Sequence, residues 1–406
     1  METEKLLVLN AGTSSLKFAV YERNSDLKPL IRGKIERIGE VVAKCWLCNL
    51  SSEKETRRNV PAQTHVAALE ILLKALGEVL DIEALTAVGH RIVHGGPRFS
   101  NACVVSPEVL NELRQIVSFA EEHLPAEISV IEATAARLPR VQQVVCFDTS
   151  FHRALPDVAR RLPIPRRYEA AGIRRYGFHG LSCRYMIEQV RAMWGDRAAR
   201  GRIVLAHLGN GASLTAVCEG QSIDTSMGFT PTAGLVMGTR CGDLDPGLLA
   251  YLARVESLTP KQLTDLVDRR SGLLGVSETS GDMRDLLKAV ATDARAGEAI
   301  RLFCYEAKKR IGAYAAAMNG VDILVFSGGI GENCPSVRER ICKDMSYLGL
   351  EIDDPRNDVN NKIISTTSSK VLVMVVKADE ESVIAQETHQ ALSAIVEPSP
   401  PVQIAP

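Results

Sequence analysis

Two polar, glycine-containing turns about half the chain apart carry the residue types that bind anions. Residues 10–15 (NAGTSS) join two apolar runs and are followed by Lys17, and residues 209–213 (GNGAS) lie between two further apolar runs. Glycine lets backbone N–H groups approach an anion, and Ser and Thr hydroxyls add donors. The similarity predicts a repeated strand–turn–strand unit with both loops facing one anion, whereas two unrelated hairpins are the alternative.

Charged side chains follow other apolar runs. Asp148 and Glu380 suit a hard cation such as Mg²⁺. Arg91 and Arg240 carry planar forks that fit carboxylate or phosphate oxygens. Acidic groups for a metal, cations for developing charge and N–H groups for phosphate are what phosphoryl transfer requires, because positioning and electrostatics supply most of that catalysis.

Several common enzyme classes lack their motifs here. The sequence contains no GxxxxGK[ST] phosphate loop and no GxSxG nucleophile turn. The GIG at 329–331 is followed by Cys334 where a dinucleotide fingerprint has its third glycine. Cys45 and Cys48 have no second Cys or His pair nearby, so we predict that they are strand residues rather than metal ligands.

Composition restricts the class of protein further. A chain of 406 residues exceeds one typical core, so two domains are expected. The net charge of −1 makes nucleic acid or an acidic membrane surface an unexpected partner. Ten irregularly spaced cysteines favour a reducing cytosol, the charged start is no signal peptide, and the sequence has no membrane-spanning run. We therefore expect a cytoplasmic protein.

The periodicity of apolar residues predicts the elements that position these groups. Strands are expected at 6–9, 16–21, 87–93, 141–147, 323–326 and 371–376, and helices at 62–80 and 298–318. Ser106 and Pro107 predict the start of another helix. Strands and helices in both halves predict α/β domains, with ligands at the carboxyl ends of the strands, where the polar clusters lie. The tail, residues 397–406, is expected to be disordered.

Eight segments together match one known family in its own order. They are LNAGTSSLKF (9–18), GHRIVHGG (89–96), FDTSFH (147–152), YGFHGLS (176–182), AHLGNGAS (206–213), DTSMGFTPTAGLVMGTRCGDLDPG (224–247), SGGIGEN (327–333) and EESVIA (380–385). On these motifs the chain resembles the acetate kinase family, within the acetate and sugar kinase/Hsp70/actin superfamily.

The resemblance implies an α/β fold of two domains with duplicated ribonuclease-H-like cores and an active-site cleft between them. The N-terminal domain would be residues 1–150, with a helix at about 383–396 packing back on it, and the C-terminal nucleotide-binding domain would be 151–382. The implied reaction is reversible, direct in-line transfer from ATP to acetate, giving acetyl phosphate and ADP, with Mg²⁺ or alternatively Mn²⁺. Members of the family are generally homodimers.

The resemblance also assigns roles. Asn10 and Glu380 would organise Mg²⁺, Lys17 would meet the ATP phosphates and Arg91 would hold acetate. Asp148 would be an essential acid, with His179 and Arg240 stabilising the transition state. The phosphate cradle would be His207, Leu208, Gly209, Asn210 and Gly211, and the adenosine site would be Asp282, Met283, Arg284, Gly329, Ile330, Gly331, Glu332 and Asn333.

Chemical reasoning supports these assignments. Acetate is already ionised at neutral pH, so its attack needs little base catalysis, and the difficulty is to bring two anions together. We therefore favour a role in metal organisation for Asp148 over proton transfer, although both remain open. Apolar walls from Val93, Phe178 and Pro231 would hold the acyl methyl group and limit its length.

One departure from the family pattern keeps alternatives open. Glu122 stands where an apolar residue of the acyl pocket is usual, and an ionised carboxylate there would repel acetate. The alternatives are a kinase for propionate or another short acid, and a nucleotide-binding switch protein without acyl activity. The enzyme is favoured because a switch has no need of an arginine pair at the acyl end, and the set of expected residues is complete: Asn10, Arg91, Asp148, His179, Arg240 and Glu380.

Overall fold

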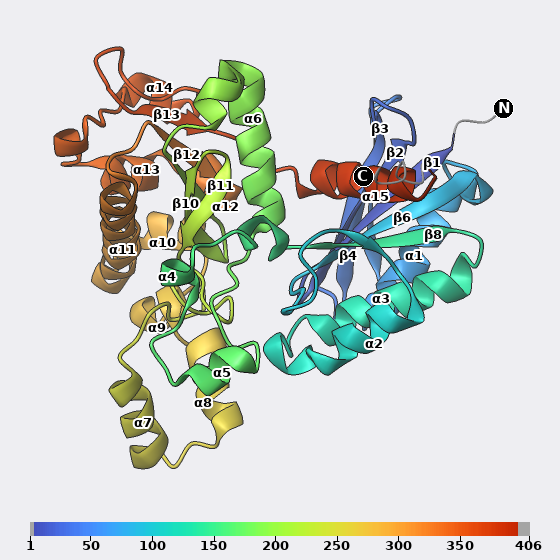
Figure 1. Cartoon of the computed structure of the whole chain (residues 1–406), viewed down its shortest axis with the longest axis horizontal. Helices are drawn as coiled ribbons and strands as arrows, with labels where there is room; N and C mark the ends of the chain where they lie inside the picture. Colours follow the sequence, from blue (N-terminus) through green and yellow to red (C-terminus); the bar gives the residue numbers. More distant parts are fainter. Residues whose placement is uncertain (1–3, 397–406) are drawn as a thin grey trace, which may run out of the picture. The chain divides into compact units, whose positions relative to one another are not determined.

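Each half of the chain folds around its own β-sheet. The computed structural model describes residues 4–396 (Figure 1) and divides into two units, residues 4–150 with 379–396, and residues 151–378. The predicted disordered tail, 397–406, lies outside the described residues.

The sheet of the first unit has eight strands in the order β5-β4-β3-β2-β1-β6-β8-β7. Strand β1 runs antiparallel to β2 and parallel to β6, which in turn runs parallel to β8. The strands are β1 (Lys5–Ala11), β2 (Ser15–Glu22), β3 (Pro29–Glu36), β4 (Ala43–Asn49), β5 (Lys54–Val60), β6 (Leu85–Ile92), β7 (Cys103–Val104) and β8 (Gln142–Phe147). Cys45 and Cys48 lie in β4, as predicted, so they are strand residues.

Helices cover both faces of this sheet. On one face α1 (His65–Gly77) buries Leu69 and Leu72 in a core that includes Leu7 and Leu9, and α3 (Leu124–Arg137) packs beside α1, with α2 (Pro107–Gln115) against α3. On the opposite face α15 (Glu380–Val396) packs on β1, β6 and β8. The approach is close, because a Cβ on Gly89 would lie 2.2 Å from Thr388 Oγ1. The C-terminal helix is therefore part of the first unit.

The second unit has a five-stranded sheet in the order β11-β10-β9-β12-β13. Its strands are β9 (Ile203–Leu208), β10 (Ala212–Cys218), β11 (Gln221–Thr225), β12 (Ile323–Ser327) and β13 (Leu372–Val375). Helix α6 (Gly180–Ala199) packs on one face, and α11 (Ala294–Met318) packs against β10. The other helices are α4 (Asp157–Arg160), α5 (Arg166–Ala170), α7 (Pro246–Val255), α8 (Pro260–Arg269), α9 (Gly272–Ser277), α10 (Met283–Ala289), α12 (Gly328–Asn333), α13 (Pro335–Cys342) and α14 (Asp354–Asp358).

The two sheets share one topology. In β3-β2-β1-β6-β8 and in β11-β10-β9-β12-β13, two antiparallel pairings are followed by two parallel ones. The predicted turns join the corresponding hairpins, between Ala11 and Leu16 and between Leu208 and Ala212. The prediction of a repeated unit is confirmed, and the order is that of a duplicated ribonuclease-H-like core.

Local signals explain most helix ends. The Ser106 side chain accepts from the Val109 N–H with Pro107 in the first turn, as predicted for α2. Helix α11 ends at left-handed Asn319 (φ 56°), also as predicted, but it begins at Ala294 rather than at residue 298. The earlier start follows from Asp293, whose carboxylate caps the helix.

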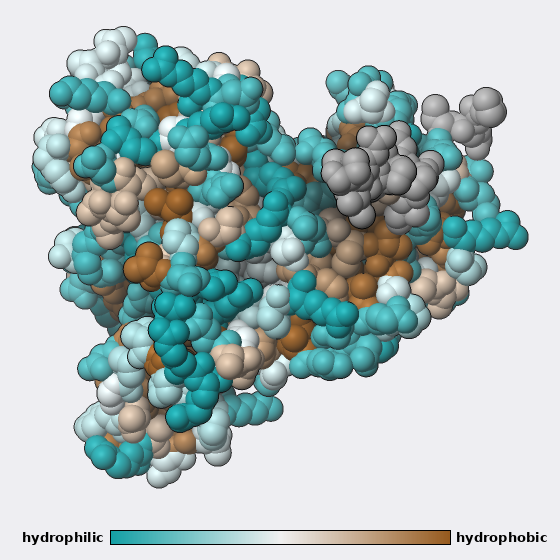
Figure 2. Space-filling model, in the orientation of Figure 1, coloured by the Kyte–Doolittle hydropathy of each residue, from teal (hydrophilic) through white to brown (hydrophobic). Residues whose placement is uncertain are grey.

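On the face drawn in Figure 2, hydrophilic residues are interrupted by patches of apolar ones. Among residues 4–396, no helix combines the length and the apolar character that crossing a bilayer requires.

Candidate active site

The carboxyl ends of β6 and β8 bring an arginine and an aspartate together in the first unit. Arg91 Nη2 and Nε donate to the same Asp148 oxygen, Oδ2, at 2.6 and 3.1 Å. Arg91 Nη1 donates to the Ala11 carbonyl at 3.2 Å. Asp148 is fully buried and the Arg91 side chain is 13% exposed. Burial lowers the pKa of Arg91, but the carboxylates of Asp148 and Glu380 outweigh it and raise this pKa overall. The guanidinium is therefore a fixed positive charge.

A second polar cluster joins the end of β1 to the start of α15. Asn10 Nδ2 donates to Glu380 Oε2 at 2.9 Å and to Glu381 Oε1 at 3.0 Å. Burial and neighbouring Glu380 raise the pKa of Glu381, whereas Lys17 lowers it. Lys17 lies directly opposite Asn10 on β2 and is exposed. The carboxylates and the lysine therefore share one end of the sheet.

The oxygen atoms of this cluster are chemically suited to Mg²⁺. Mg²⁺ prefers carboxylate and carbonyl oxygens and keeps several water or phosphate ligands, so one or two protein ligands suffice. Within residues 4–396 no group of three or more His, Cys, Asp or Glu residues is arranged to enclose a metal ion. Asn10 and Glu380 therefore fit an open Mg²⁺ site and not a closed structural one.

Asp379 fixes the start of α15 and with it Glu380. The Asp379 carboxylate accepts from the Ser382 N–H at 3.2 Å and from Arg32 Nη2 at 2.6 Å. Arg32 lies on β3, so the first turn of the helix is tied to the sheet. This explains how a residue near the end of the sequence comes to lie beside Asn10.

In the second unit His179 and Arg240 face one glycine. A Cβ on Gly211 would lie 3.5 Å from His179 Nε2 and 3.6 Å from Arg240 Nη1. His179 Nδ1 lies 2.9 Å from Ser213 Oγ, and its ring centroid is 4.3 Å from that of His207. The predicted transition-state residues and part of the predicted phosphate cradle are therefore neighbours.

Four glycine-containing segments meet around this cradle. Gly238 N–H donates to the Asn210 carbonyl at 3.0 Å, and a Cβ on Gly238 would lie 3.0 Å from the Gly281 carbonyl. Gly328 has φ +78°, and a Cβ there would lie 2.6 Å from the Leu208 carbonyl. These close approaches explain why glycine is needed at 238 and 328.

Gly329 differs from those glycines. It is exposed, and no atom of the described residues would lie within 4 Å of a Cβ at this position. Neither packing nor a positive φ requires glycine here, so the absence of a side chain leaves open space beside the cradle. A ligand that lies flat against the backbone would use that space.

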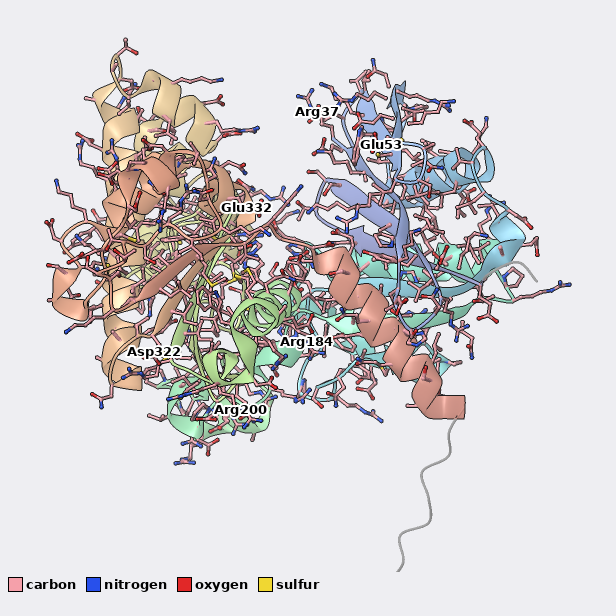
Figure 3. All side chains as sticks on the ribbon, turned by 90° about the horizontal axis from the view of Figure 1, so that it is seen from above. Arg37, Glu53, Arg184, Arg200, Asp322 and Glu332 are labelled. Carbon is pink, nitrogen blue, oxygen red and sulfur yellow. The ribbon has the colours of Figure 1, made fainter. Side chains whose placement is uncertain are left out.

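Several residues predicted to bind adenosine also hold the local structure. Asp282 caps α10, accepting from the Arg284 N–H at 2.8 Å, and its carboxylate bonds the Arg284 guanidinium. Glu332, labelled in Figure 3, accepts from the Gly328 and Ala378 N–H groups at 3.0 and 2.9 Å. Asn333 donates to the Gly329 carbonyl at 3.0 Å. The buried residues of this set are Met283, Ile330 and Gly331.

The residues predicted to form an acyl wall belong to different units. Val93, which is buried, follows β6 in the first unit. Buried Phe178 and half-buried Pro231 lie in the second unit. Glu122, the suspected obstacle in this wall, is a half-buried residue of the turn before α3.

Sequence reasoning missed a carboxyl group beside Val93. Glu127 on α3 is 2% exposed, and its Oε2 and Oε1 accept from the Val93 N–H at 3.1 and 3.3 Å. Burial raises the pKa of Glu127 to about 8, although Arg91 opposes the rise. In the sequence Glu127 reads as an ordinary acid in the first turn of a helix, so no signal marked it as buried.

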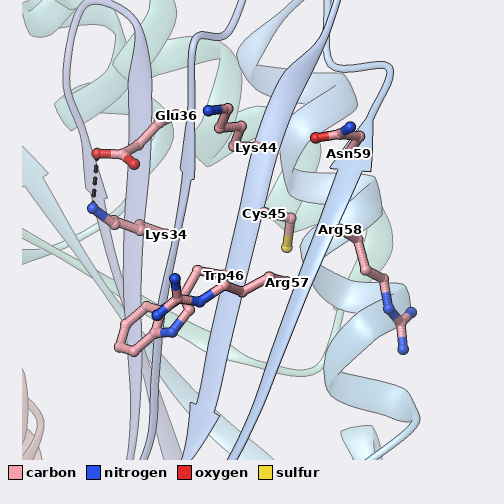
Figure 4. Close-up of a pocket in the computed structure, with 8 residues that line it drawn as sticks. All are labelled: Lys34, Glu36, Lys44, Cys45, Trp46, Arg57, Arg58 and Asn59. Carbon is pink, nitrogen blue, oxygen red and sulfur yellow. Dashed lines mark hydrogen bonds and ion pairs between the residues drawn. The ribbon is translucent and has the colours of Figure 1, made fainter.

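A cavity of about 750 Å³ lies away from all these groups, over β3, β4 and β5 (Figure 4). Three of its cations are already paired, Lys34 with Glu36, Arg57 with Glu55 and Arg58 with Glu78. Its lining residues are Lys34, Glu36, Lys44, Cys45, Trp46, Arg57, Arg58 and Asn59. None of the predicted site residues lines this cavity.

Comparisons with known proteins identify the family of this chain. The sequence model of the acetokinase family matches residues 5–386. An acetate kinase of Carboxydothermus hydrogenoformans is 42% identical over 393 residues, which cover 95% of this chain and 98% of that protein. An acetate kinase of Caldanaerobacter subterraneus is also 42% identical, covering 96% of this chain and 100% of the relative.

Solved structures of acetate and propionate kinases also match nearly the whole chain. The crystal structure of Porphyromonas gingivalis acetate kinase has a TM-score of 0.86 at 38% identity and covers 96% of this chain and 100% of that one. A propionate kinase from Francisella tularensis has a TM-score of 0.89 at 35% identity, covering 95% of this chain and 99% of that one. The chain therefore belongs to the acetokinase family.

Proposed function

We propose that this chain is a reversible, Mg²⁺-dependent acetate kinase that transfers the γ-phosphoryl group of ATP directly and in line to acetate, giving acetyl phosphate and ADP. The observation that carries the proposal is the buried pair of Arg91 and Asp148 beside Asn10 and Glu380. A fixed guanidinium next to a set of metal-binding oxygens suits a carboxylate substrate that must meet a metal-bound polyphosphate.

Arg91 would hold the acetate carboxylate. A guanidinium has five N–H donors, and here four hydrogen bonds go to Asp148, Ala11 and Asn10, the last a long one of 3.5 Å. A donor of Nη2 therefore remains for the substrate. Asp148 is committed to Arg91, which supports an organising role for its carboxylate over proton transfer.

Asn10 and Glu380 would hold Mg²⁺, or Mn²⁺ in its place, and Lys17 would meet the ATP phosphates. When bound, the metal ion supplies charge neutralisation on the phosphate oxygens. Asn10 is held by both Glu380 and Glu381, so the first turn of α15 supplies carboxylates at a defined place.

His179 and Arg240 would stabilise the phosphoryl group in transit. Both side chains face Gly211, so a group lying against that glycine would meet the imidazole and the guanidinium together. Cationic donors placed where charge develops are the largest catalytic contribution expected for this reaction, because acetate needs no general base. His207, Leu208, Gly209 and Asn210 would complete the phosphate cradle.

The second unit would then be the nucleotide-binding domain. Asp282, Met283 and Arg284, with residues 329–333, would contact adenosine, and the open space at Gly329 supports a flat ligand there. We further propose a cytoplasmic homodimer. Exposed Leu248, Tyr251 and Val255 on α7 offer apolar surface that association would bury.

Propionate is the second candidate acceptor. One similar solved structure is a propionate kinase, and the Glu127 carboxyl group lies beside Val93 of the predicted acyl wall. A nucleotide-binding switch without acyl activity is the remaining alternative, in which Glu122 would close the acyl site.

The decisive experiment traps acyl phosphates with hydroxylamine, using purified protein, ATP, Mg²⁺ and acids from formate to butyrate. We expect hydroxamate from acetate first and propionate second, abolished by Arg91→Ala. Arg58→Ala is the matched control, because Arg58 is an exposed arginine of the same unit paired with Glu78. If no acid gives a product while ATP still binds, the result would support a nucleotide-binding switch without acyl activity.

A further inference from the structure

The proposed mechanism does not use His152, a buried histidine of the second unit. His152 is 3% exposed and follows β8 in a short 3-10 turn. Its Nε2 lies 3.0 Å from the Phe178 carbonyl oxygen, and its Nδ1 lies 2.8 Å from Ser222 Oγ. The side chain therefore bridges two segments next to His179 without joining the cradle itself.

The tautomer of His152 follows from its partners. A carbonyl oxygen can only accept, so Nε2 carries the proton and donates to Phe178. Burial lowers the pKa of His152 to about 4, so the ring is neutral at neutral pH and Nδ1 accepts from the Ser222 hydroxyl. The hydrogen bond to Phe178 is present across the neutral pH range.

The backbone that His152 holds has an uncommon conformation. His179 is in the left-handed region, with φ 58° and ψ 27°, at the start of α6. A left-handed residue other than glycine is strained and persists where its surroundings hold it. Gly177 is left-handed too, with φ 73°, and a Cβ there would lie 2.7 Å from the His152 ring. His152 thus packs against Gly177 and bonds Phe178, the two residues before His179.

We infer that His152 is a positioning residue for the proposed reaction, which holds the Phe178 carbonyl and thereby aims His179 Nε2 at the phosphoryl site beside Gly211. The inference rests on the proposed function, because it gives His152 a role through the transition-state role of His179. Ser213 restrains the other end of His179, at Nδ1, so backbone and side chain are fixed separately.

Two substitutions separate the two hydrogen bonds of His152. The amide of His152→Gln can donate from the position of Nε2, whereas the shorter amide of His152→Asn reaches Ser222 but not Phe178. We expect His152→Asn to lower kcat about 10- to 100-fold, as a misplaced catalytic group does, with both KM values changed less than about threefold. His152→Gln recovers most of the loss. Equal losses in both variants, or losses in KM alone, would overturn the inference.

A double-mutant cycle separates positioning from general destabilisation. If His152 acts through His179, His152→Asn costs less than about threefold in kcat in a His179→Ala background. If the two losses multiply in full, His152 does not act through His179. The folded fraction of each variant is determined by circular dichroism, and kcat is expressed per folded enzyme.

A readout independent of turnover distinguishes failure of this inference from failure of the proposed function. The rate at which diethylpyrocarbonate modifies His179, followed by peptide mass spectrometry, reports the exposure and orientation of its ring. We expect a several-fold change in His152→Asn and the wild-type rate in His152→Gln. An unchanged rate in His152→Asn overturns the inference even if the wild type makes acetyl phosphate. If the modification rate changes in His152→Asn but the wild type makes no acetyl phosphate, the proposed function is refuted, whereas the orientation of His179 by His152 is supported.

Discussion

Arg91 donates two hydrogen bonds to a single oxygen of Asp148, from Nη2 at 2.6 Å and from Nε at 3.1 Å. Since the carboxylate is fully buried, its charge is balanced largely by this guanidinium. The two residues therefore act as one unit, in which the aspartate orients the guanidinium and the guanidinium faces the buried carboxylate.

Asp148→Asn should lose activity through Arg91. Removing the negative charge leaves a buried cation without its partner and lets the fork turn, which costs about 2–5 kcal/mol in pairs of this kind. We expect most of the loss in kcat/KM for acetate, with a smaller change in KM for ATP. Steady-state kinetics with each substrate varied in turn measure the split. The double variant with Arg91→Ala should be little worse than either single one, and a fully multiplicative loss would contradict the shared role.

Asn10→Ala should raise the Mg²⁺ requirement. The substitution removes the amide that holds Glu380 and Glu381 in place. Loss of a residue that orients metal ligands costs about 10- to 100-fold in metal affinity. The Mg²⁺ concentration for half-maximal activity, measured at saturating ATP, should rise accordingly. Asn24→Ala, in an exposed turn of the same unit, is the control, and an equal shift in both variants would remove Asn10 from the metal site.

Gly329→Ala should weaken ATP binding without destabilising the fold. The new Cβ enters open space, and alanine within α12 is favoured over glycine by about 0.8–1.0 kcal/mol. We therefore expect an unchanged or higher melting temperature together with a higher KM for ATP and an unchanged KM for acetate. Gly77→Ala in α1, where the Cβ would lie 3.6 Å from Ile82, is the matched control for the helix effect. A wild-type KM for ATP would place adenosine elsewhere.

Glu127 predicts how stability depends on pH. Its pKa is raised from 4.5 to about 8 by burial, so the folded chain binds a proton that the unfolded chain has released between these values. Stability therefore falls as the pH rises through this range, by up to about 1.4 kcal/mol per pH unit. Glu127→Gln keeps an acceptor for Val93 but does not ionise, so the variant should become more stable than the wild type above pH 8.

Urea unfolding at several pH values tests this prediction. The two proteins should have similar stability near pH 5, diverge as the pH rises to about 8, and differ by a constant amount at higher pH. Parallel curves across the range would mean that Glu127 is ionised in the folded chain throughout, held by Arg91.

Much of the fold was predictable because its signals are local. The hairpin turns at 10–15 and 209–213, the Ser106 cap and the left-handed end of α11 at Asn319 each depend on a few adjacent residues. Because a short turn joins β1 to β2, their register follows from the turn and pairs Lys17 with Asn10.

The rest depends on contacts that sequence spacing does not encode. Glu127 is buried because α3 docks on the sheet beside Val93, and the salt bridge of Arg32 with Asp379 joins residues 347 positions apart. His152 becomes informative once Phe178 and Ser222 are known to lie on either side of it. The burial of Glu127, the Arg32–Asp379 salt bridge and the contacts of His152 all depend on long-range packing, so the neighbouring residues in the sequence do not reveal them.

The place of α15 has a consequence for how the protein is made. Glu380 and the helix that carries it are synthesised after the whole second unit, yet they belong to the unit that contains β1. Until then the sheet face around Gly89 lacks its cover and the metal-binding cluster lacks its carboxylates. The first unit can therefore be completed only after the second unit has been made.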